Sequence, residues 1–205
     1  MCPAEVINRS ERKSKMDLRE IKFGIEIETV KQTRDTIAWA IHSVVGGTVS
    51  HTGEPSCYDT WEVKGIDGRR WKVMADSSLS NVPFNLRAEV VSPVLGYEDI
   101  DQMQEVVRAV KRCGAKISRQ CGIHIHIDAA PFDGRRLGNL AKMVYKQEPL
   151  ILHALGIRQN RLQRYTRPIT DNLIQQIEEK KPKTKEQLNP IWYGYENSCP
   201  HHYHS

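Results

Sequence analysis

Two glutamates separated by one residue, Glu26 and Glu28, lie in the segment KFGIEIET at positions 22–29. Alternating apolar and acidic residues predict a β-strand, on which every second side chain points to the same face. The two carboxylates are then about 7 Å apart and repel each other unless a cation lies between them. Their hard oxygen atoms suit Mg²⁺ or Mn²⁺. Taken alone, the motif is explained more simply by an acidic strand face in water.

Two histidines have the same spacing in GIHIHID at positions 122–128. The alternation predicts a strand with His124, His126 and Asp128 on one face and three isoleucines on the other. Imidazoles at alternate strand positions can present nitrogen atoms to a metal or a phosphate. The alternative is the solvated face of an amphipathic strand, for which threonine or lysine would serve equally well.

Two further carboxylates are candidate ligands. Glu89 lies in LRAEVVS at positions 86–92, a predicted strand that ends before Pro93, and it shares a face with Arg87. It is either a metal ligand or half of a surface ion pair, which would add little stability. Asp76 lies in MADSSLS. It either bonds the backbone of a local turn or faces a ligand.

Four arginines follow at intervals of three residues, a spacing that lines up side chains if the segment is helical. They could neutralise phosphates, and the alternative is a solvated helix face. Neither GxGxxG nor GxxxxGK[ST] occurs in the sequence, so a nucleotide would have to be held through metals, arginine and histidine. The four residues are Arg158, Arg161, Arg164 and Arg167.

The elements that position these residues are predicted from periodicity. Residues 33–45 have helical spacing, with Thr33 as a cap and Gly46 and Gly47 as the end. Residues 61–74 form a hairpin around an Asp-Gly pair. Residues 97–113 form a helix whose apolar face includes Val107. This mixture predicts an α+β fold, with a mainly antiparallel sheet and helices packed on one face.

The C-terminal third is predicted to be mostly helical. Residues 135–155 form a helix that is bent or broken at Pro149, and residues 170–180 form a short helix. The segment KKPKTKE, residues 180–186, is expected to be a polar linker. No helix is expected in residues 189–205, which are rich in aromatic residues and histidine.

Bulk composition restricts the class of protein. The chain has 205 residues, of which 39% are hydrophobic and 27% charged, as in globular proteins outside the membrane. We expect one domain at residues 17–205, after a polar tail at residues 1–16 that has no features of a signal peptide. Five cysteines without a CxxC pair indicate no disulfide framework, so we expect a cytoplasmic protein. The net charge of +5 is weak evidence for nucleic-acid binding.

Taken in order, several segments resemble the putative amidoligase family of the carboxylate–amine ligase superfamily, which includes glutamine synthetase and glutamate–cysteine ligase. The resemblance covers residues 23–203, and the ordered set is more specific than any single motif. The segments are FGIEIET, HTGEPSCYDTWEVKGIDGRRWKVMADSSLS, AEVVSPVL and CGIHIHIDA.

The resemblance implies a glutamine-synthetase-like catalytic fold, in which a curved antiparallel sheet binds ATP, Mg²⁺ or Mn²⁺ and a carboxylate substrate on one face. Glu26 and His124 would hold the metal on the nucleotide phosphates. Glu28 and Glu89 would hold the metal near the acceptor carboxylate. The resemblance also assigns nucleotide contact to His126, substrate or metal binding to Asp76, and phosphate binding to arginines such as Arg161 and Arg164.

The reaction implied is amide or peptide bond formation through an acyl phosphate, which requires no side-chain nucleophile. The substrates would be small-molecule or peptide carboxylates and amines, and a homo-oligomer is compatible with this reading. Neither a membrane nor a nucleic-acid partner is expected. Members of the superfamily have a later strand with a pattern like VEFR, and this sequence ends before such a segment, so we expect a C-terminally truncated catalytic domain.

Three other interpretations compete with this one. HIHIDA is similar to the HxHxDH signature of zinc hydrolases, but Ala129 replaces the last histidine. A truncated domain could also be an inactive fragment. A nucleic-acid-binding module would fit the charge and the arginines, but no recognised motif supports it. Zinc content, ATP dependence and salt-dependent binding to DNA or RNA distinguish these possibilities.

Overall fold

A computed structural model of the chain describes residues 17–53, 57–157, 162 and 168–194. The chain forms two compact units, Met1–Asp128 and Ala129–Ser205, which are described separately below. Among the described helices, none has the length and apolar character needed to cross a membrane.

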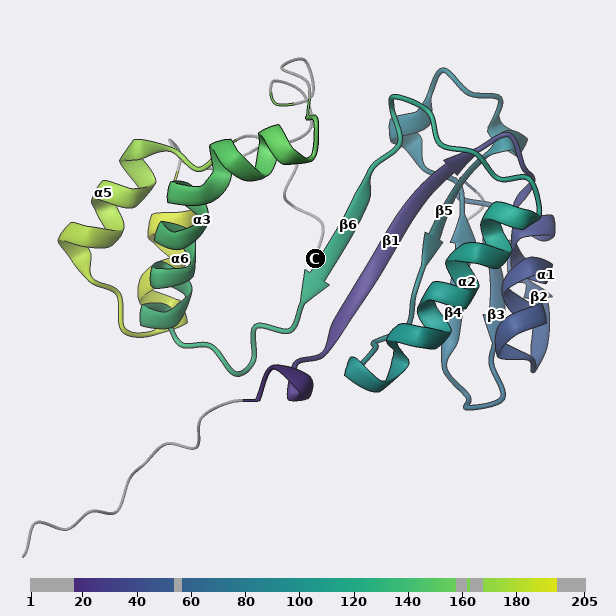
Figure 1. Cartoon of the computed structure of the whole chain (residues 1–205), viewed down its shortest axis with the longest axis horizontal. Coiled ribbons are helices and arrows are strands. Elements are labelled where there is room, and N and C mark those ends of the chain that lie inside the picture. The colour runs from purple at the N-terminus through teal and green to yellow at the C-terminus, as the bar shows by residue number, and fades with distance from the viewer. Residues whose placement is uncertain (1–16, 54–56, 158–161, 163–167, 195–205) are drawn as a thin grey trace, which may run out of the picture. The chain divides into compact units, whose positions relative to one another are not determined.

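The first unit is built on an open, six-stranded antiparallel sheet (Figure 1). Across the sheet the order is β2-β3-β4-β5-β1-β6, so the first strand of the sequence lies between β5 and β6. The predicted antiparallel sheet is thus confirmed. The strands are β1 (Phe23–Val30), β2 (Thr48–His51), β3 (Trp61–Lys64), β4 (Arg70–Met74), β5 (Arg87–Val91) and β6 (Ile123–Ile127).

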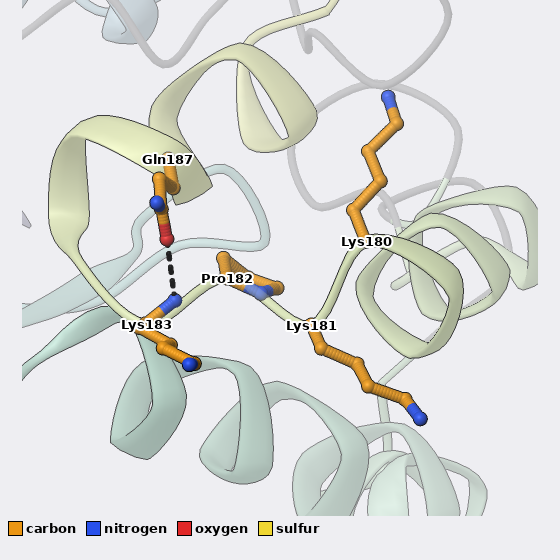
Figure 2. A pocket seen from close by; sticks show the side chains of 5 residues that line it. All are labelled: Lys180, Lys181, Pro182, Lys183 and Gln187. Carbon is orange, nitrogen blue, oxygen red and sulfur yellow. Dashed lines mark hydrogen bonds between the residues drawn. The ribbon is translucent and has the colours of Figure 1, made fainter.

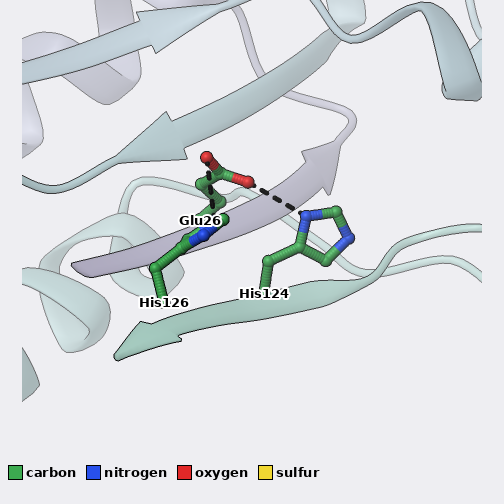
Figure 3. Close-up of side chains that lie close together, drawn as sticks. All are labelled: Glu26, His124 and His126. Atoms are coloured by element: carbon green, nitrogen blue, oxygen red, sulfur yellow. Dashed lines mark hydrogen bonds and ion pairs between the residues drawn. The ribbon is translucent and has the colours of Figure 1, made fainter. Parts of the chain in front are cut away.

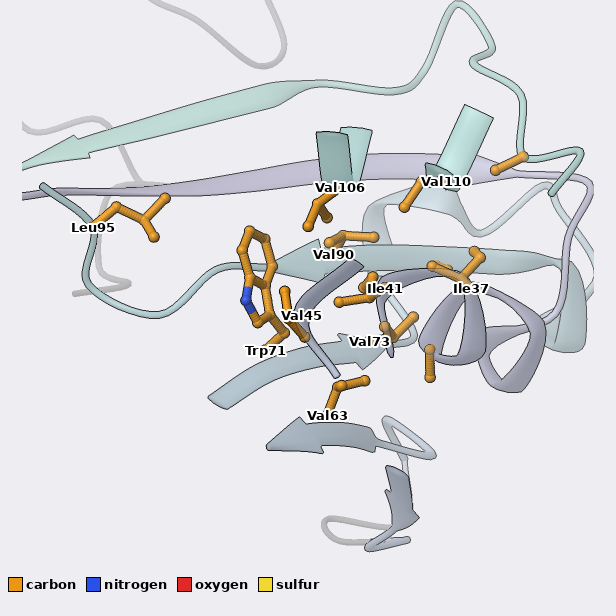
Figure 4. Close-up of a cluster of buried hydrophobic side chains, with 13 residues drawn as sticks. Ile37, Ile41, Val45, Val63, Trp71, Val73, Val90, Leu95, Val106 and Val110 are labelled. Atoms are coloured by element: carbon orange, nitrogen blue, oxygen red, sulfur yellow. The ribbon is translucent and has the colours of Figure 1, made fainter. Parts of the chain in front are cut away.

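Helices α1 (Arg34–Val45) and α2 (Ile100–Arg112) pack on one face of this sheet, as predicted (Figures 1 and 4). Ile37 and Ile41 of α1 are fully buried, and Val106 of α2 is almost so. Val107 was expected on the same buried face, but it is 39% exposed. Each residue is rotated by about 100° around the helix axis from the one before it, so Val107 points away from the side on which Val106 is buried. The strands contribute Val63, Trp71, Val73, Ala88 and Val90 to this core.

Turn residues end the elements where the sequence predicted. Thr33 precedes α1, but its hydroxyl bonds Thr36 Oγ1 at 2.9 Å and makes no cap to the backbone. Gly46 ends α1 at a φ of 65°, which favours glycine. Gly68 has a φ of 81° in the turn that joins β3 to β4. The predicted helix and hairpin are therefore confirmed.

The strand β2 was not predicted, because TVSH is short and mostly exposed and shows no clear alternation. Four short 3₁₀ helices complete the first unit. They are η1 (Leu18–Glu20), η2 (Ser77–Leu79), η3 (Phe84–Leu86) and η4 (Tyr97–Asp99).

The second unit contains α3 (Gly134–Ala154), α5 (Asp171–Lys180) and α6 (Lys185–Trp192) (Figure 1). The first two were predicted. Helix α3 was expected to be bent or broken at Pro149, and it continues through that residue without a break. The three helices share a small apolar core formed by Ala141, Leu173, Ile177, Leu188 and Ile191.

Helix α6 corrects two expectations, a polar linker over residues 180–186 and the absence of a helix after position 189. Thr184 and Gln187 form a capping box at its start. Leu188 and Ile191, three positions apart, are buried in the core. The spacing T-x-x-Q before these apolar residues is a helix-start signal that could have predicted α6.

Candidate metal-binding site

The two glutamates of β1 have different cross-strand neighbours on the face of the sheet opposite the core. Glu26 pairs with His124 on β6, whereas Glu28 pairs with Glu89 on β5. Directly opposite residues in an antiparallel pair point to the same face, with Cβ atoms about 5 Å apart. The register therefore brings together side chains that are separated by up to about 100 positions in the sequence.

One cluster lies between β1 and β6 (Figure 3). The Glu26 carboxylate accepts from His124 Nδ1 at 3.0 Å and lies 3.2 Å from His126 Nε2. Both imidazoles are about half exposed, at 55% and 49%, while Glu26 is 27% exposed. This cluster, which we call the imidazole cluster, offers two nitrogen ligands and one oxygen ligand within 4.8 Å of one another.

A second cluster contains only carboxylates, from Glu28, Asp76 and Glu89, with ligand atoms also within 4.8 Å of one another. We call it the carboxylate cluster. Glu28 is buried, and its Oε2 accepts from the Gly122 backbone N–H at 2.9 Å. Asp76 caps η2 by accepting from Ser78 N at 2.8 Å, so its predicted local turn role is confirmed, while its carboxylate also lies near Glu28 and Glu89.

The carboxylate cluster is electrostatically unfavourable without a cation. Burial raises the pKa of Glu89 to about 7, and the negative charges of Asp76, Glu26 and Glu28 add to this shift. Burial also raises the pKa of Glu28, although the Gly122 N–H opposes the shift. The His124 imidazole lies nearby, with its Nε2 3.9 Å from Glu28 Oε1.

The donor atoms of both clusters fit divalent metal ions. Three carboxylates form the hard oxygen set that Mg²⁺ and Mn²⁺ prefer. Two imidazoles and one carboxylate suit Mn²⁺ or a softer ion such as Zn²⁺. A metal in either cluster would offset the repulsion that raises the Glu89 pKa.

Six of the predicted site residues are thus gathered on one face, namely Glu26, Glu28, Asp76, Glu89, His124 and His126. The predicted phosphate-binding residues Arg161 and Arg164 lie outside the described residues, as do Arg158 and Arg167. The alternative interpretation of Glu89 as half of a surface pair is not realised. Within the part of the chain that the structure describes, it makes no ion pair with Arg87, whose guanidinium lies over the Phe84 ring at 5.1 Å.

A buried arginine missed by the sequence analysis positions the start of β5. Arg34, on the first turn of α1, is 4% exposed and ion-pairs with Asp59. Its Nη1 donates to the carbonyls of Phe84 and Arg87 at 2.6 and 2.8 Å. The strand that carries Glu89 is therefore anchored to α1. A polar residue in the first turn of a predicted helix gave no sign of this role.

An α+β fold whose sheet carries carboxylates and imidazoles on the face opposite α1 and α2 is compatible with an enzyme that binds divalent metal ions. Comparison with known families identifies it further: the family described as "Putative amidoligase enzyme" matches residues 19–205. The chain therefore belongs to this family, and the match includes every residue of both clusters. The family description indicates an enzyme of the ligase class. No curated protein and no solved structure matches the chain.

Proposed function

We propose that this protein is an ATP-dependent carboxylate–amine ligase that forms an amide or peptide bond through an acyl phosphate. The observation that supports it most strongly is the pair of clusters on one sheet face, next to each other along β1. Their separate donor sets would allow two divalent ions to be held side by side, an arrangement that can neutralise charge during phosphoryl transfer to a carboxylate. The proposal includes the glutamine-synthetase-like arrangement that the sequence resemblance implies.

Each cluster would have its own task. Glu26 and His124 would hold the ion on the ATP phosphates, with His126 against the nucleotide. Glu28 and Glu89 would hold the ion near the acceptor carboxylate, with Asp76 as a third oxygen donor or a substrate contact. Mg²⁺ or Mn²⁺ bound there would neutralise charge on the phosphoryl and carboxylate oxygens.

The chemistry needs positioning more than side-chain reactivity. A carboxylate oxygen of the substrate attacks the γ-phosphorus of ATP, and the bond to ADP breaks. The amine nitrogen then attacks the carbonyl carbon of the acyl phosphate, the carbon–oxygen bond to phosphate breaks, and the amine loses a proton. No step uses an enzyme nucleophile, so the carboxylates and imidazoles of the site would serve only to hold metal ions and substrates.

One lysine on the same sheet face as the clusters supports the binding of anionic substrates. Lys72 lies opposite Val91, which lies opposite Glu26, so these side chains form one row across the sheet face. Adjacent strands are about 4.8 Å apart, which places the Lys72 backbone about 10 Å from that of Glu26. Its exposed ammonium group could reach a phosphate or carboxylate bound over the clusters.

A trapping assay tests the proposal without knowledge of the amine. The purified chain is incubated with ATP, Mg²⁺, hydroxylamine and pools of amino acids and peptides. We expect hydroxamate and ADP in equal amounts, because hydroxylamine intercepts acyl phosphates. The variant Glu28→Gln/Glu89→Gln should lose both products, whereas Glu105→Gln/Arg108→Gln, which breaks an exposed pair on α2, should retain them. Hydroxamate formation without ATP would contradict the proposal.

A zinc-dependent hydrolase is the second candidate, and the imidazole cluster is the observation that favours it. Two histidines and one glutamate are also the ligands of some catalytic zinc sites. On this alternative the purified protein would contain stoichiometric zinc and hydrolyse its substrate without ATP. The carboxylate cluster would then have no defined task, and for this reason we rank the hydrolase second.

A further inference from the structure

The second unit contains a basic cavity remote in sequence from both metal-binding clusters. Two adjoining cavities of about 440 and 550 Å³ share Lys181, Pro182 and Lys183, which connect α5 to α6 (Figure 2). Helix α3 contributes the other wall of the larger cavity, including Arg135 and Lys142. Volumes of this size are typical of sites for small molecules.

The lining has a strong excess of positive charge. Five cationic residues line the two cavities, namely Arg135, Lys142, Lys180, Lys181 and Lys183, and Glu178 is the only carboxylate among the lining residues. The Lys180 ammonium donates to Gln176 Oε1 at 3.2 Å. For the other four cations, no hydrogen bond or ion pair from the side chain to a described residue is present. Their charge is thus available to a ligand.

The backbone that carries the three lysines is held in place. Lys181 ends α5 in the left-handed conformation, with its N–H donating to Ile177 O at 3.0 Å. Pro182 is buried. The Lys183 N–H donates to Gln187 Oε1 at 2.8 Å, a bond visible in Figure 2. An ordered turn lowers the entropy cost of collecting these charges around an anion.

Two glycines of α3 allow the helix to approach this turn closely. A Cβ at Gly134 would lie 2.1 Å from the Thr184 carbonyl oxygen, and a Cβ at Gly138 would lie 3.0 Å from Ile177 Cγ2. The first position therefore excludes any other residue without movement of the backbone. Close packing places Arg135 and Lys142 along the same cavity as the lysine turn.

We propose that this cavity binds a small soluble anion carrying two or more phosphate groups. Several phosphates are needed to match four cations that have no side-chain partner among the described residues, and ammonium and guanidinium groups are the usual phosphate donors in proteins. A small ligand is favoured over nucleic acid because the cations line cavities within one helical unit. A nucleic-acid strand would instead follow an extended basic groove. The site does not depend on the proposed ligase activity.

Calorimetric titration of the full chain with inorganic tripolyphosphate tests this site. Metal-free buffer keeps the clusters of the sheet from binding a metal–phosphate complex. We expect one tripolyphosphate per chain, with binding weakened at least about tenfold in Lys181→Gln/Lys183→Gln. These substitutions retain the backbone bonds of the turn, and an unchanged thermal unfolding curve would verify the fold. The matched control is Lys111→Gln/Lys146→Gln, which removes the same charge at exposed positions outside the cavity.

Three results would overturn the proposal. The first is equal tripolyphosphate affinity in the wild type and in Lys181→Gln/Lys183→Gln. The second is an equal loss in the control variant, which would indicate a general charge effect. The third is binding of a 12-nucleotide oligothymidylate, but not of tripolyphosphate, by the wild type, which would identify the surface as a nucleic-acid contact.

Discussion

The imidazole cluster and the carboxylate cluster draw on neighbouring residues of β1 but lie in very different environments. Glu26 faces the edge strand β6, where its histidine partners are about half exposed. Glu28 faces β5, an interior strand, and is 6% exposed. A shift of two positions along one strand therefore changes the environment of a carboxylate. At the first position it is partly solvated and paired with imidazoles, and at the second it is buried among other carboxylates.

From this contrast we expect the carboxylate cluster to depend on a cation more strongly than the imidazole cluster does. The Glu26 carboxylate contacts both imidazoles, and its exposed part is in water, which screens its charge. Glu89 instead has a pKa raised to about 7, because burial and three carboxylates nearby disfavour its charge. We therefore expect the carboxylate cluster to bind hard ions more tightly and to respond more strongly to substitution.

The largest effect is expected from Glu28→Gln/Glu89→Gln. Removing two of three oxygen ligands should weaken Mn²⁺ binding at the carboxylate cluster about 1,000-fold, or about 4 kcal/mol. Electron paramagnetic resonance of free Mn²⁺ during a titration measures this loss. The imidazole cluster should keep its affinity within about threefold, since none of its ligands is changed. Equal losses at both clusters would show that they act as one site.

The next effect concerns pH. In the metal-free protein the pKa of Glu89 is about 7, above its ordinary value of 4.5, so the folded state binds the proton more tightly than the unfolded state. The contribution of Glu89 to the free energy of unfolding is fully present below about pH 4.5 and is lost as the pH rises through 7. The free energy of unfolding should fall by up to about 3 kcal/mol over this window.

Urea denaturation at pH 5 and pH 8 measures this change. Glu89→Gln should remove most of the difference, and saturating Mn²⁺ should stabilise the protein most at the higher pH, where the carboxylates are charged. A wild-type stability that rises from pH 5 to pH 8 without metal would contradict the assigned environment of Glu89.

The third effect separates the clusters by metal type. His124→Ala/His126→Ala should weaken Zn²⁺ binding about 100-fold, since two of the three ligands of the imidazole cluster are lost. Mg²⁺-dependent stabilisation at the carboxylate cluster should change little. Competition with a chromogenic zinc chelator measures the first quantity, and thermal unfolding with Mg²⁺ measures the second. If Mg²⁺ stabilisation disappears as well, the two clusters are not independent.

The smallest effect comes from Asp76, which both caps η2 and faces Glu28 and Glu89. Asp76→Asn keeps an oxygen that can accept from Ser78 N, whereas Asp76→Ala does not. Without metal, the asparagine variant should be more stable than the alanine variant by about 1 kcal/mol. Chemical denaturation of both variants measures the difference, and equal stabilities would show that the cap contributes nothing.

Much of this arrangement was predictable from the sequence because strand periodicity assigns faces without three-dimensional information. Alternation in KFGIEIET and GIHIHID predicted both strands and the shared faces of their carboxylates and imidazoles. Periodicity does not give strand order. The placement of β1 between β5 and β6 separates Glu26 from Glu28 in environment, and this follows only from the sheet topology.

Other features could not be predicted because their determinants are nonlocal or weak. The strand β2 consists of TVSH. It forms a strand because it pairs with β3, and its own residue types do not predict one. Arg34 is held by Asp59 and by two carbonyls about 50 residues away. Helix α6, in contrast, had a local signal in its capping box.

We propose that the sheet face opposite α1 and α2 holds two divalent ions in two distinct clusters. Diffraction from crystals grown with Mn²⁺ and recorded at the manganese absorption edge tests it directly. We expect two anomalous peaks, one within bonding distance of Glu26 and His124 and the other within bonding distance of Glu28 and Glu89. Peaks located elsewhere, or no peak on this face at saturating Mn²⁺, would contradict it.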